Sequence, residues 1–133
     1  MPSKHFPIAI SPVWRPFLLP LGVTAKRAYA EIVDGDLHVC FGRFDYYFPL
    51  DAIEDATFGR WPLWAGVGVR TNFRGVVGLI GTYVNVVEVR FTEPQQVRVF
   101  LRVPCKRLFL SLEEPHAFIT AVTRHRTAET KAA

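Results

Sequence analysis

The sequence predicts a mainly β fold, with about seven antiparallel strands in a strongly curved sheet or small barrel and one C-terminal α-helix as a cap. Several short stretches alternate apolar with polar residues, which is the period of a half-buried strand. Turn-forming residues separate these stretches, beginning with Asp34-Gly35-Asp36. Helical periodicity is convincing only near the C-terminus. At 133 residues, half of them apolar, the chain suits one domain with a single core.

The first predicted meander extends from residue 28 to residue 58. Two extended runs, 28–33 and 37–41, flank an Asp-Gly pair. Such a pair between alternating apolar runs is a strong hairpin signal, because a tight turn needs positive φ angles that glycine adopts without steric cost. A third alternating run follows, carried by Phe44, Tyr46 and Phe48. We therefore expect consecutive antiparallel strands.

A second hairpin is predicted for residues 83–91 and 96–103, around the turn-like tetrapeptide Thr92-Glu93-Pro94-Gln95. Between the two hairpins, residues 60–81 are expected to form a bent strand and loop, with bulges or close backbone approaches at Gly75, Gly78 and Gly81. A last short strand is expected at 108–112.

The predicted helix extends from about Leu112 to Arg124. Ser111 is its expected N-cap, and Glu114, three residues later, completes a capping box that satisfies two backbone amides. The apolar stripe of this helix is formed by Phe118, Ile119 and Val122. The polar residues 127–133 are expected to be a disordered tail.

Residues 1–22 are a proline-rich apolar leader in front of one β domain at 23–126. Prolines at positions 2, 7, 12, 16 and 20 exclude a continuous helix, and a membrane span would need about 20 uninterrupted apolar residues. The same prolines argue against a signal peptide. We expect an extended strap packed over the domain, and the alternative is an arm that contacts a membrane or a partner.

Three segments together resemble the bacterial PH-like (pleckstrin-homology-like) proteins of actinobacterial type. They are IVDGDLHVCFGRFDYYFPLDAIEDA from residue 32, the central GVGVR, and the closing SLEEPHAFI. This resemblance covers about residues 25–125 and implies a seven-stranded, two-sheet roll capped by a helix, with no known activity. PH domains that bind phosphoinositides carry basic residues in the first hairpin loop. Here that loop contains Asp34 and Asp36, which argues against headgroup binding there.

No enzymatic, metal or cofactor chemistry is expected. The histidines lack the spacing of a zinc motif, and His38 and Cys40 share a strand face without a visible third ligand. No Gly-x-Ser-x-Gly elbow occurs, and the glycines at 66 and 68 lack the third glycine of a dinucleotide-binding loop. Cys40 and Cys105 are expected to be free, buried or half-buried thiols.

Two candidate binding sites follow from composition. Aromatic residues gather near the glycine-rich region and are expected to bind a protein partner or a small apolar ligand; they are Trp61, Trp64, Phe73 and Tyr83. If the second hairpin pairs around its predicted turn, one face carries Arg90, Arg98 and Arg102. Three guanidinium groups suit an anionic headgroup or an acidic partner, whereas the simpler alternative is a solvated face balanced by Glu88.

The leading hypothesis is a cytoplasmic, non-enzymatic binding module for a protein partner or a small apolar ligand. One alternative is a membrane-associated protein that binds anionic lipid through the arginine face, and another is a calycin-like or START-like cavity protein. The net charge of +4 is mild and no nucleic-acid-binding motif accompanies it, so no nucleic acid is expected as a partner. Exposed sheet edges leave a homodimer as an open alternative.

Overall fold

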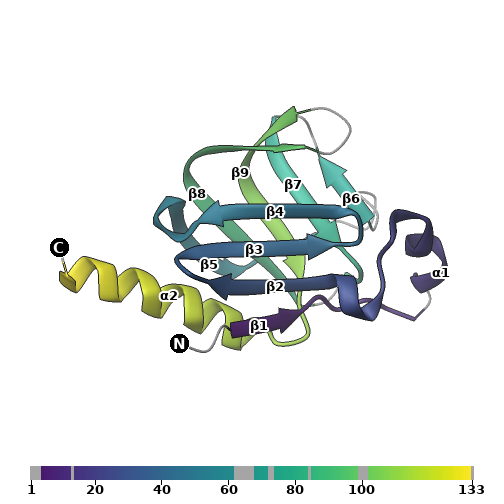
Figure 1. Ribbon diagram of the computed structural model, residues 1–133, viewed down its shortest axis with the longest axis horizontal. Helices are drawn as coiled ribbons and strands as arrows, with labels where there is room; N and C mark the ends of the chain where they lie inside the picture. The colour runs from purple at the N-terminus through teal and green to yellow at the C-terminus, as the bar shows by residue number, and fades with distance from the viewer. Residues whose placement is uncertain are drawn as a thin grey trace.

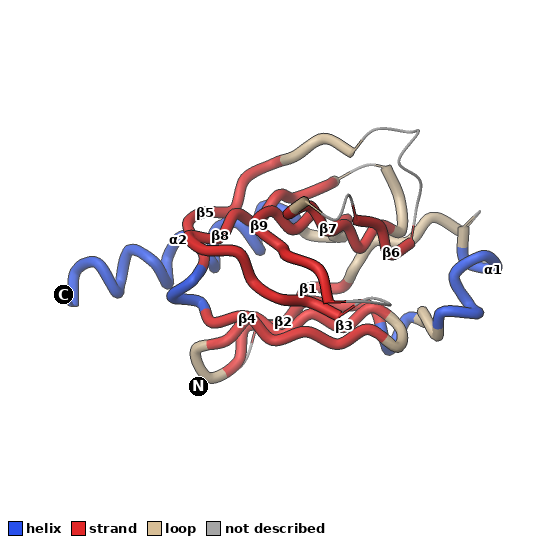
Figure 2. Tube along the Cα trace, turned by 90° about the horizontal axis from the view of Figure 1, so that it is seen from above, coloured by secondary structure: helices blue, strands red, loops and turns tan. Residues whose placement is uncertain are grey.

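The computed structural model describes residues 4–12, 14–61, 68–71, 74–83, 85–98 and 102–132. Two sheets form separate layers (Figure 2), and their strands cross at a steep angle (Figure 1). The front sheet has the order β1 (Lys4–Pro7), β2 (Ala28–Val33), β3 (Asp36–Phe41), β4 (Phe44–Pro49). The back sheet has the order β5 (Ile53–Phe58), β8 (Val86–Arg98), β9 (Arg102–Ser111), β7 (Gly75–Ile80), β6 (Gly68–Thr71). Over the described residues the two sheets do not close into a barrel.

The first predicted hairpin is confirmed. β2 and β3 pair antiparallel up to Val33 and Asp36, and the two residues between them, Asp34 and Gly35, have φ angles of 49° and 83°. Both angles lie in the left-handed region that a two-residue hairpin turn requires. β4 continues the meander, so the front sheet follows the alternation of the sequence.

The second hairpin is corrected by the structure. β8 continues through the predicted turn at 92–95, and its ladder with β9 shifts register between Arg90 and Gln95. A bulge of this kind accommodates Pro94, which has no N–H to donate to the ladder. The strand reverses only after Arg98, which lies opposite Arg102 in β9. The segments 83–91 and 96–103 therefore do not pair with each other as predicted.

The strands were expected to be antiparallel throughout, but β7 and β9 run parallel, with Gly75 opposite Cys105. The cause is topological. The chain reverses from β7 to β8 and again from β8 to β9, and β9 then lies between them. Two reversals leave β7 and β9 pointing the same way. The described strands number nine, against about seven predicted.

The core lies between the sheets and is closed at one end by helix α2 (Pro115–Ala132), which contacts β5 and β8. Phe118 is fully buried and meets the ring of Phe6 edge-on, with the centroids 5.3 Å apart. The predicted C-terminal helix is thus confirmed, but it begins at Pro115 and not at about Leu112. Proline is well tolerated in the first turn of a helix. This helix has no Gly or Pro after Pro115 to end it, and so includes most of the segment expected as a tail.

Ser111 is not the helix N-cap that the sequence suggested. It is the last residue of β9, and its hydroxyl accepts a hydrogen bond from the Gly81 amide (2.8 Å) and donates one to the Ala9 carbonyl (2.9 Å). The buried hydroxyl is satisfied by distant backbone groups, so the strand extends to residue 111 and the capping box does not form.

The leader is integrated into the fold over residues 4–10. β1 pairs with β2, Ile8 bridges to Leu112, and Ile10 bridges to Gly81. Beyond this strap the chain forms the short helix α1 (Arg15–Leu18) and the 3-10 turns η1 (Leu19–Leu21) and η2 (Ala25–Arg27), whereas an extended segment was expected. A third such turn, η3 (Leu50–Ala52), connects the sheets. None of the helices within the described ranges has the length and apolarity to span a bilayer.

Candidate functional site: a groove at the open edge of β4

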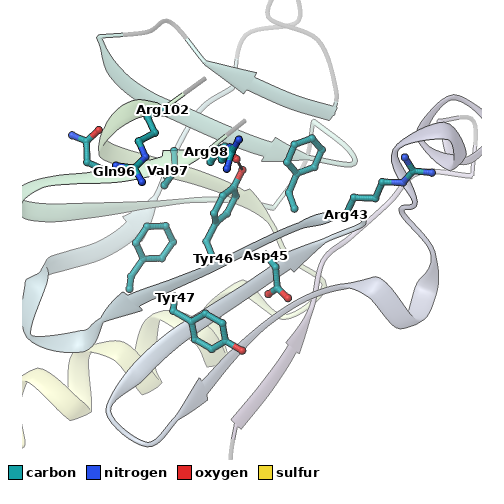
Figure 3. Close-up of a pocket in the computed structure, with 10 residues that line it drawn as sticks. Arg43, Asp45, Tyr46, Tyr47, Gln96, Val97, Arg98 and Arg102 are labelled. Carbon is teal, nitrogen blue, oxygen red and sulfur yellow. Dashed lines mark hydrogen bonds between the residues drawn. The ribbon is translucent and has the colours of Figure 1, made fainter. Parts of the chain in front are cut away.

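A groove of about 690 Å³ lies between β4 and the far end of the β8–β9 hairpin (Figure 3). Five consecutive residues of β4, from Phe44 to Phe48, line it, together with Arg43 from the preceding turn. The other wall consists of Gln96, Val97, Arg98 and Arg102. We call this cleft the β4 groove.

The β4 groove follows a strand edge. Neighbouring side chains of a strand point to opposite faces, so a cleft that touches five consecutive residues runs along the edge and not over one face. β4 is the last strand of the front sheet and pairs only with β3 among the described strands. An edge strand directs alternate N–H and C=O groups away from its partner, and these groups are available for hydrogen bonding.

Tyr46 connects the two walls. Its phenolic hydroxyl donates a 2.8 Å hydrogen bond to the main-chain carbonyl of Arg98, and in Figure 3 its side chain points from β4 toward that residue. Burial, with a smaller contribution from Cys105, raises the pKa of Tyr46 to about 12. The hydroxyl is therefore protonated at neutral pH and acts as a donor.

The charge of the groove is predominantly positive. It has three guanidinium groups, from Arg43, Arg98 and Arg102, and one carboxylate, from Asp45. Asp45 is in hydrogen-bond contact with the His38 ring, and none of the ion pairs between described residues joins it to an arginine. The carboxylate is thus occupied by a residue outside the groove, which leaves the arginines available to an anionic ligand.

Of the three arginines that the sequence placed on one face, the structure brings two together. Arg98 and Arg102 lie directly opposite each other, but Arg90 is separated from them by the bulge in β8. Arg90 instead donates two hydrogen bonds to Asp55, at 2.8 and 2.6 Å, beside a second ion pair between Arg107 and Glu88 at 2.5 Å. The proposed lipid-binding face therefore loses one of its three cations.

The aromatic candidates occupy a different place. The Trp61 ring covers Gly78 so closely that an added Cβ there would lie 2.5 Å from it, and it packs against Phe109 at a centroid distance of 5.3 Å. Tyr83 meets Trp14 at 6.4 Å and joins the same small hydrophobic cluster. Trp64 and Phe73 lie outside the described residues. Neither Trp61 nor Tyr83 lines the β4 groove.

Sequence reasoning missed Arg43, Tyr46 and Gln96 as site residues. Tyr46 carried a weak signal, because a buried tyrosine needs a partner for its hydroxyl. No signal in the sequence indicated the groove itself, because the open edge of β4 depends on the order of the strands in the sheet.

No cysteine or histidine is among the described residues that line the β4 groove. Cys40 and Cys105 are buried and unbridged, as expected, and burial raises the pKa of Cys105 to about 12. Across the described part of the chain, no three His, Cys, Asp or Glu side chains gather as metal ligands would.

Comparison with protein-family models, with curated proteins and with solved structures finds no match to this chain.

Proposed function

We propose that this protein is a non-enzymatic binding module that takes an extended, acidic segment of a partner protein along the open edge of β4. The observation that carries the proposal is the groove's contact with five consecutive residues of an edge strand. In strand addition, main-chain hydrogen bonds supply affinity and pockets for alternate side chains supply specificity. β4 has six residues, so a partner segment of similar length fits it.

The arginines argue for an acidic segment. A guanidinium group binds a carboxylate through two parallel hydrogen bonds, which gives direction as well as attraction. Arg98 and Arg102 face each other across the hairpin, and Arg43 lies beyond the start of β4. Carboxylates spaced along an extended peptide match cations at more than one position along the groove.

The polar groups of the groove favour binding over catalysis. The Tyr46 phenol, with its pKa raised to about 12, is a poor base near neutral pH. Asp45 is exposed at the rim, and its carboxylate is already in hydrogen-bond contact with the His38 ring.

A PH-like architecture is part of this proposal. It is supported by a front sheet built as a meander, a second sheet that crosses it, and a C-terminal helix at one end. The parallel β7–β9 pair and the five-stranded back sheet depart from the simple seven-stranded roll. The solved structure of a homologue would decide whether the fold is PH-like or a different two-sheet architecture.

The experiment measures fluorescence anisotropy of two labelled heptapeptides, one alternating valine with glutamate and one alternating valine with lysine. The acidic peptide is expected to bind and the basic one is not. Arg98→Glu and Arg102→Glu should each weaken binding by at least tenfold, because an attractive charge-assisted contact with the peptide is replaced by repulsion. Arg124→Glu, the same charge change on an exposed residue of α2, is the matched control.

Backbone recognition is tested separately with N-methylated peptides. Only alternate amides of an added strand face β4. Methylation of either the odd-numbered or the even-numbered amides of the peptide should therefore abolish binding, and methylation of the other set should be tolerated. Equal binding of all methylated peptides would exclude strand addition, and equal binding of acidic and basic peptides would exclude the role of the arginines.

A small apolar ligand is the second candidate. A cavity of about 310 Å³ lies beside the leader, lined mainly by apolar residues that include Pro7, Ile8, Ile10 and Val23. This volume is at the lower limit of ligand pockets, which hold about 300–1,000 Å³. Native mass spectrometry of the purified protein, beside a denatured control, tests it: extra mass that is lost on denaturation would favour this candidate.

A further inference from the structure

We propose that the α1–η1 segment, Arg15–Leu21, docks on an anionic membrane surface by inserting Phe17 and Leu19 into the interface. This surface adjoins the β4 groove, since Arg43 lines the groove and also lies beside Gly22, but the proposal does not depend on the peptide ligand. In Figure 1 the segment projects from one end of the molecule, opposite the C-terminal end of α2, and Figure 2 shows the same arrangement from above.

The segment exposes apolar area that the fold does not require. Phe17 is 68% exposed and Leu19 is 58% exposed, and they account for two of the four large exposed hydrophobic residues in the described ranges. Two such side chains within three residues form a concentrated patch on a projecting turn. Exposed apolar patches of this kind mark sites that contact a partner or a membrane.

The exposure is built into an ordered turn. Leu18, between the two exposed residues, is buried, and its amide bonds to the Trp14 carbonyl at 3.2 Å. Its carbonyl accepts from the Val23 amide at 3.3 Å, and the Gly22 amide bonds to Leu19 at 2.8 Å. Because Leu18 anchors the turn in the core, Phe17 and Leu19 are held outward on either side of it.

An aromatic base supports the projecting residues. Trp14 lies 5.8 Å from the Phe17 ring and 6.4 Å from the Tyr83 ring, and all three are partly or largely exposed. Tryptophan and tyrosine are favoured where apolar acyl chains meet polar headgroups, because their rings are apolar and their N–H or O–H groups remain solvated.

Charge identifies the occupant as an anionic surface. Residues 1–30 contain no Asp or Glu, and three cationic residues lie in the segment or shortly after it, namely Arg15, Lys26 and Arg27. A fourth cation is adjacent in space, since a Cβ added at Gly22 would lie 3.0 Å from Cγ of Arg43. Basic residues next to an inserted apolar patch are attracted to anionic lipid headgroups. A projecting patch inserts into a bilayer, whereas a protein partner would need a matching pocket.

The test measures co-sedimentation of the full chain with vesicles of phosphatidylcholine containing 30% phosphatidylglycerol, and with vesicles of phosphatidylcholine alone. We expect binding to the anionic vesicles that weakens as salt rises. Phe17→Ser should weaken it about tenfold and Phe17→Ser with Leu19→Ser about a hundredfold, as each removes a large apolar side chain from the interface. Phe58→Ser, at an exposed phenylalanine of β5, is the matched control and should bind like the unchanged protein.

Quenching of tryptophan fluorescence by brominated acyl chains provides a second measurement on the unchanged protein, and we expect quenching by the anionic vesicles. Failure of the unchanged protein to bind anionic vesicles would overturn the proposal. So would equal losses in the Phe17→Ser and Phe58→Ser variants, or vesicle binding without quenching.

Discussion

The hydroxyl of Tyr46 donates a hydrogen bond of 2.8 Å to the main-chain carbonyl of Arg98, and these residues are 52 positions apart in the chain. The bond joins the front sheet to the end of the β8–β9 hairpin beside the β4 groove. This hydrogen bond holds the far end of β8 near β4. The far end of β8 has no pairing with β5, because the β5–β8 ladder ends at Phe91.

Removing this hydroxyl should loosen the groove. Tyr46→Phe keeps the buried ring but leaves the Arg98 carbonyl without its donor, and we expect a loss of about 1 kcal/mol in the free energy of unfolding by urea. Hydrogen exchange should rise at the end of β8. Tyr47→Phe, at the exposed neighbour, is the control and should change stability little. Equal effects of the two substitutions would contradict the structural role of this bond.

The two groove arginines that form a cross-strand pair should lower the stability of the protein while they contribute to peptide binding. Arg98 and Arg102 lie directly opposite each other, and like charges in a cross-strand pair are unfavourable. Arg102→Thr is expected to leave the free energy of unfolding unchanged or to raise it by a few tenths of a kcal/mol, while it weakens acidic-peptide binding. A clear loss of stability, measured by urea unfolding at low salt, would show that the pair is stabilising in another way.

Stability should fall at alkaline pH. Burial raises the pKa of Tyr46 from about 10 to about 12 and that of Cys105 from about 9 to about 12. Between pH 9 and 12 the unfolded chain releases these protons and the folded protein retains them, so the free energy of unfolding decreases across this window. Urea midpoints measured at pH 8, 10 and 11 should decline, and Tyr46→Phe should reduce the decline above pH 10. A midpoint that is constant to pH 11 would contradict the burial of both groups.

Gly81 should not tolerate a side chain. An added Cβ would lie 2.5 Å from the Ala9 carbonyl oxygen and 2.7 Å from Cγ1 of Ile10, where the leader forms a parallel bridge to Gly81 just after β7. Because one of these atoms belongs to the backbone, Gly81→Ala is expected to cost about 2–3 kcal/mol. Gly35→Ala is the comparison, since it meets no atom within 4 Å and its cost comes only from a φ of 83°, at about 1 kcal/mol. Thermal unfolding of both variants would rank them, and the reverse order would contradict the close approach of the leader to Gly81.

Both cysteines should resist alkylation in the native state. Cys40 and Cys105 are buried, and desolvation raises the pKa of each thiol, so little reactive thiolate is present at pH 8. Mass spectrometry after treatment with iodoacetamide should find no adduct in buffer and two adducts in urea. Rapid native labelling of either residue would contradict its burial.

Local chemistry in the sequence was sufficient to determine several elements. The Asp34-Gly35 pair determined the first hairpin because the turn needs two positive φ angles, and the alternation in residues 37–41 and 44–48 determined which side chains face the core. The helical stripe around Phe118 determined that one helix covers the sheets at the C-terminus. These features depend on interactions between residues close in the chain.

Only the tertiary structure decided the features that depend on distant residues. Residues 92–95 have the composition of a turn, but pairing with β9 holds them within β8. Ser111 has the spacing of a helix cap, but the backbones of Ala9 and Gly81 occupy its hydroxyl. The edge position of β4 follows from the order of the strands, and the sequence of a strand does not show whether it pairs on one side or on both. The candidate groove and its pair of arginines therefore became visible only after the two sheets were assembled.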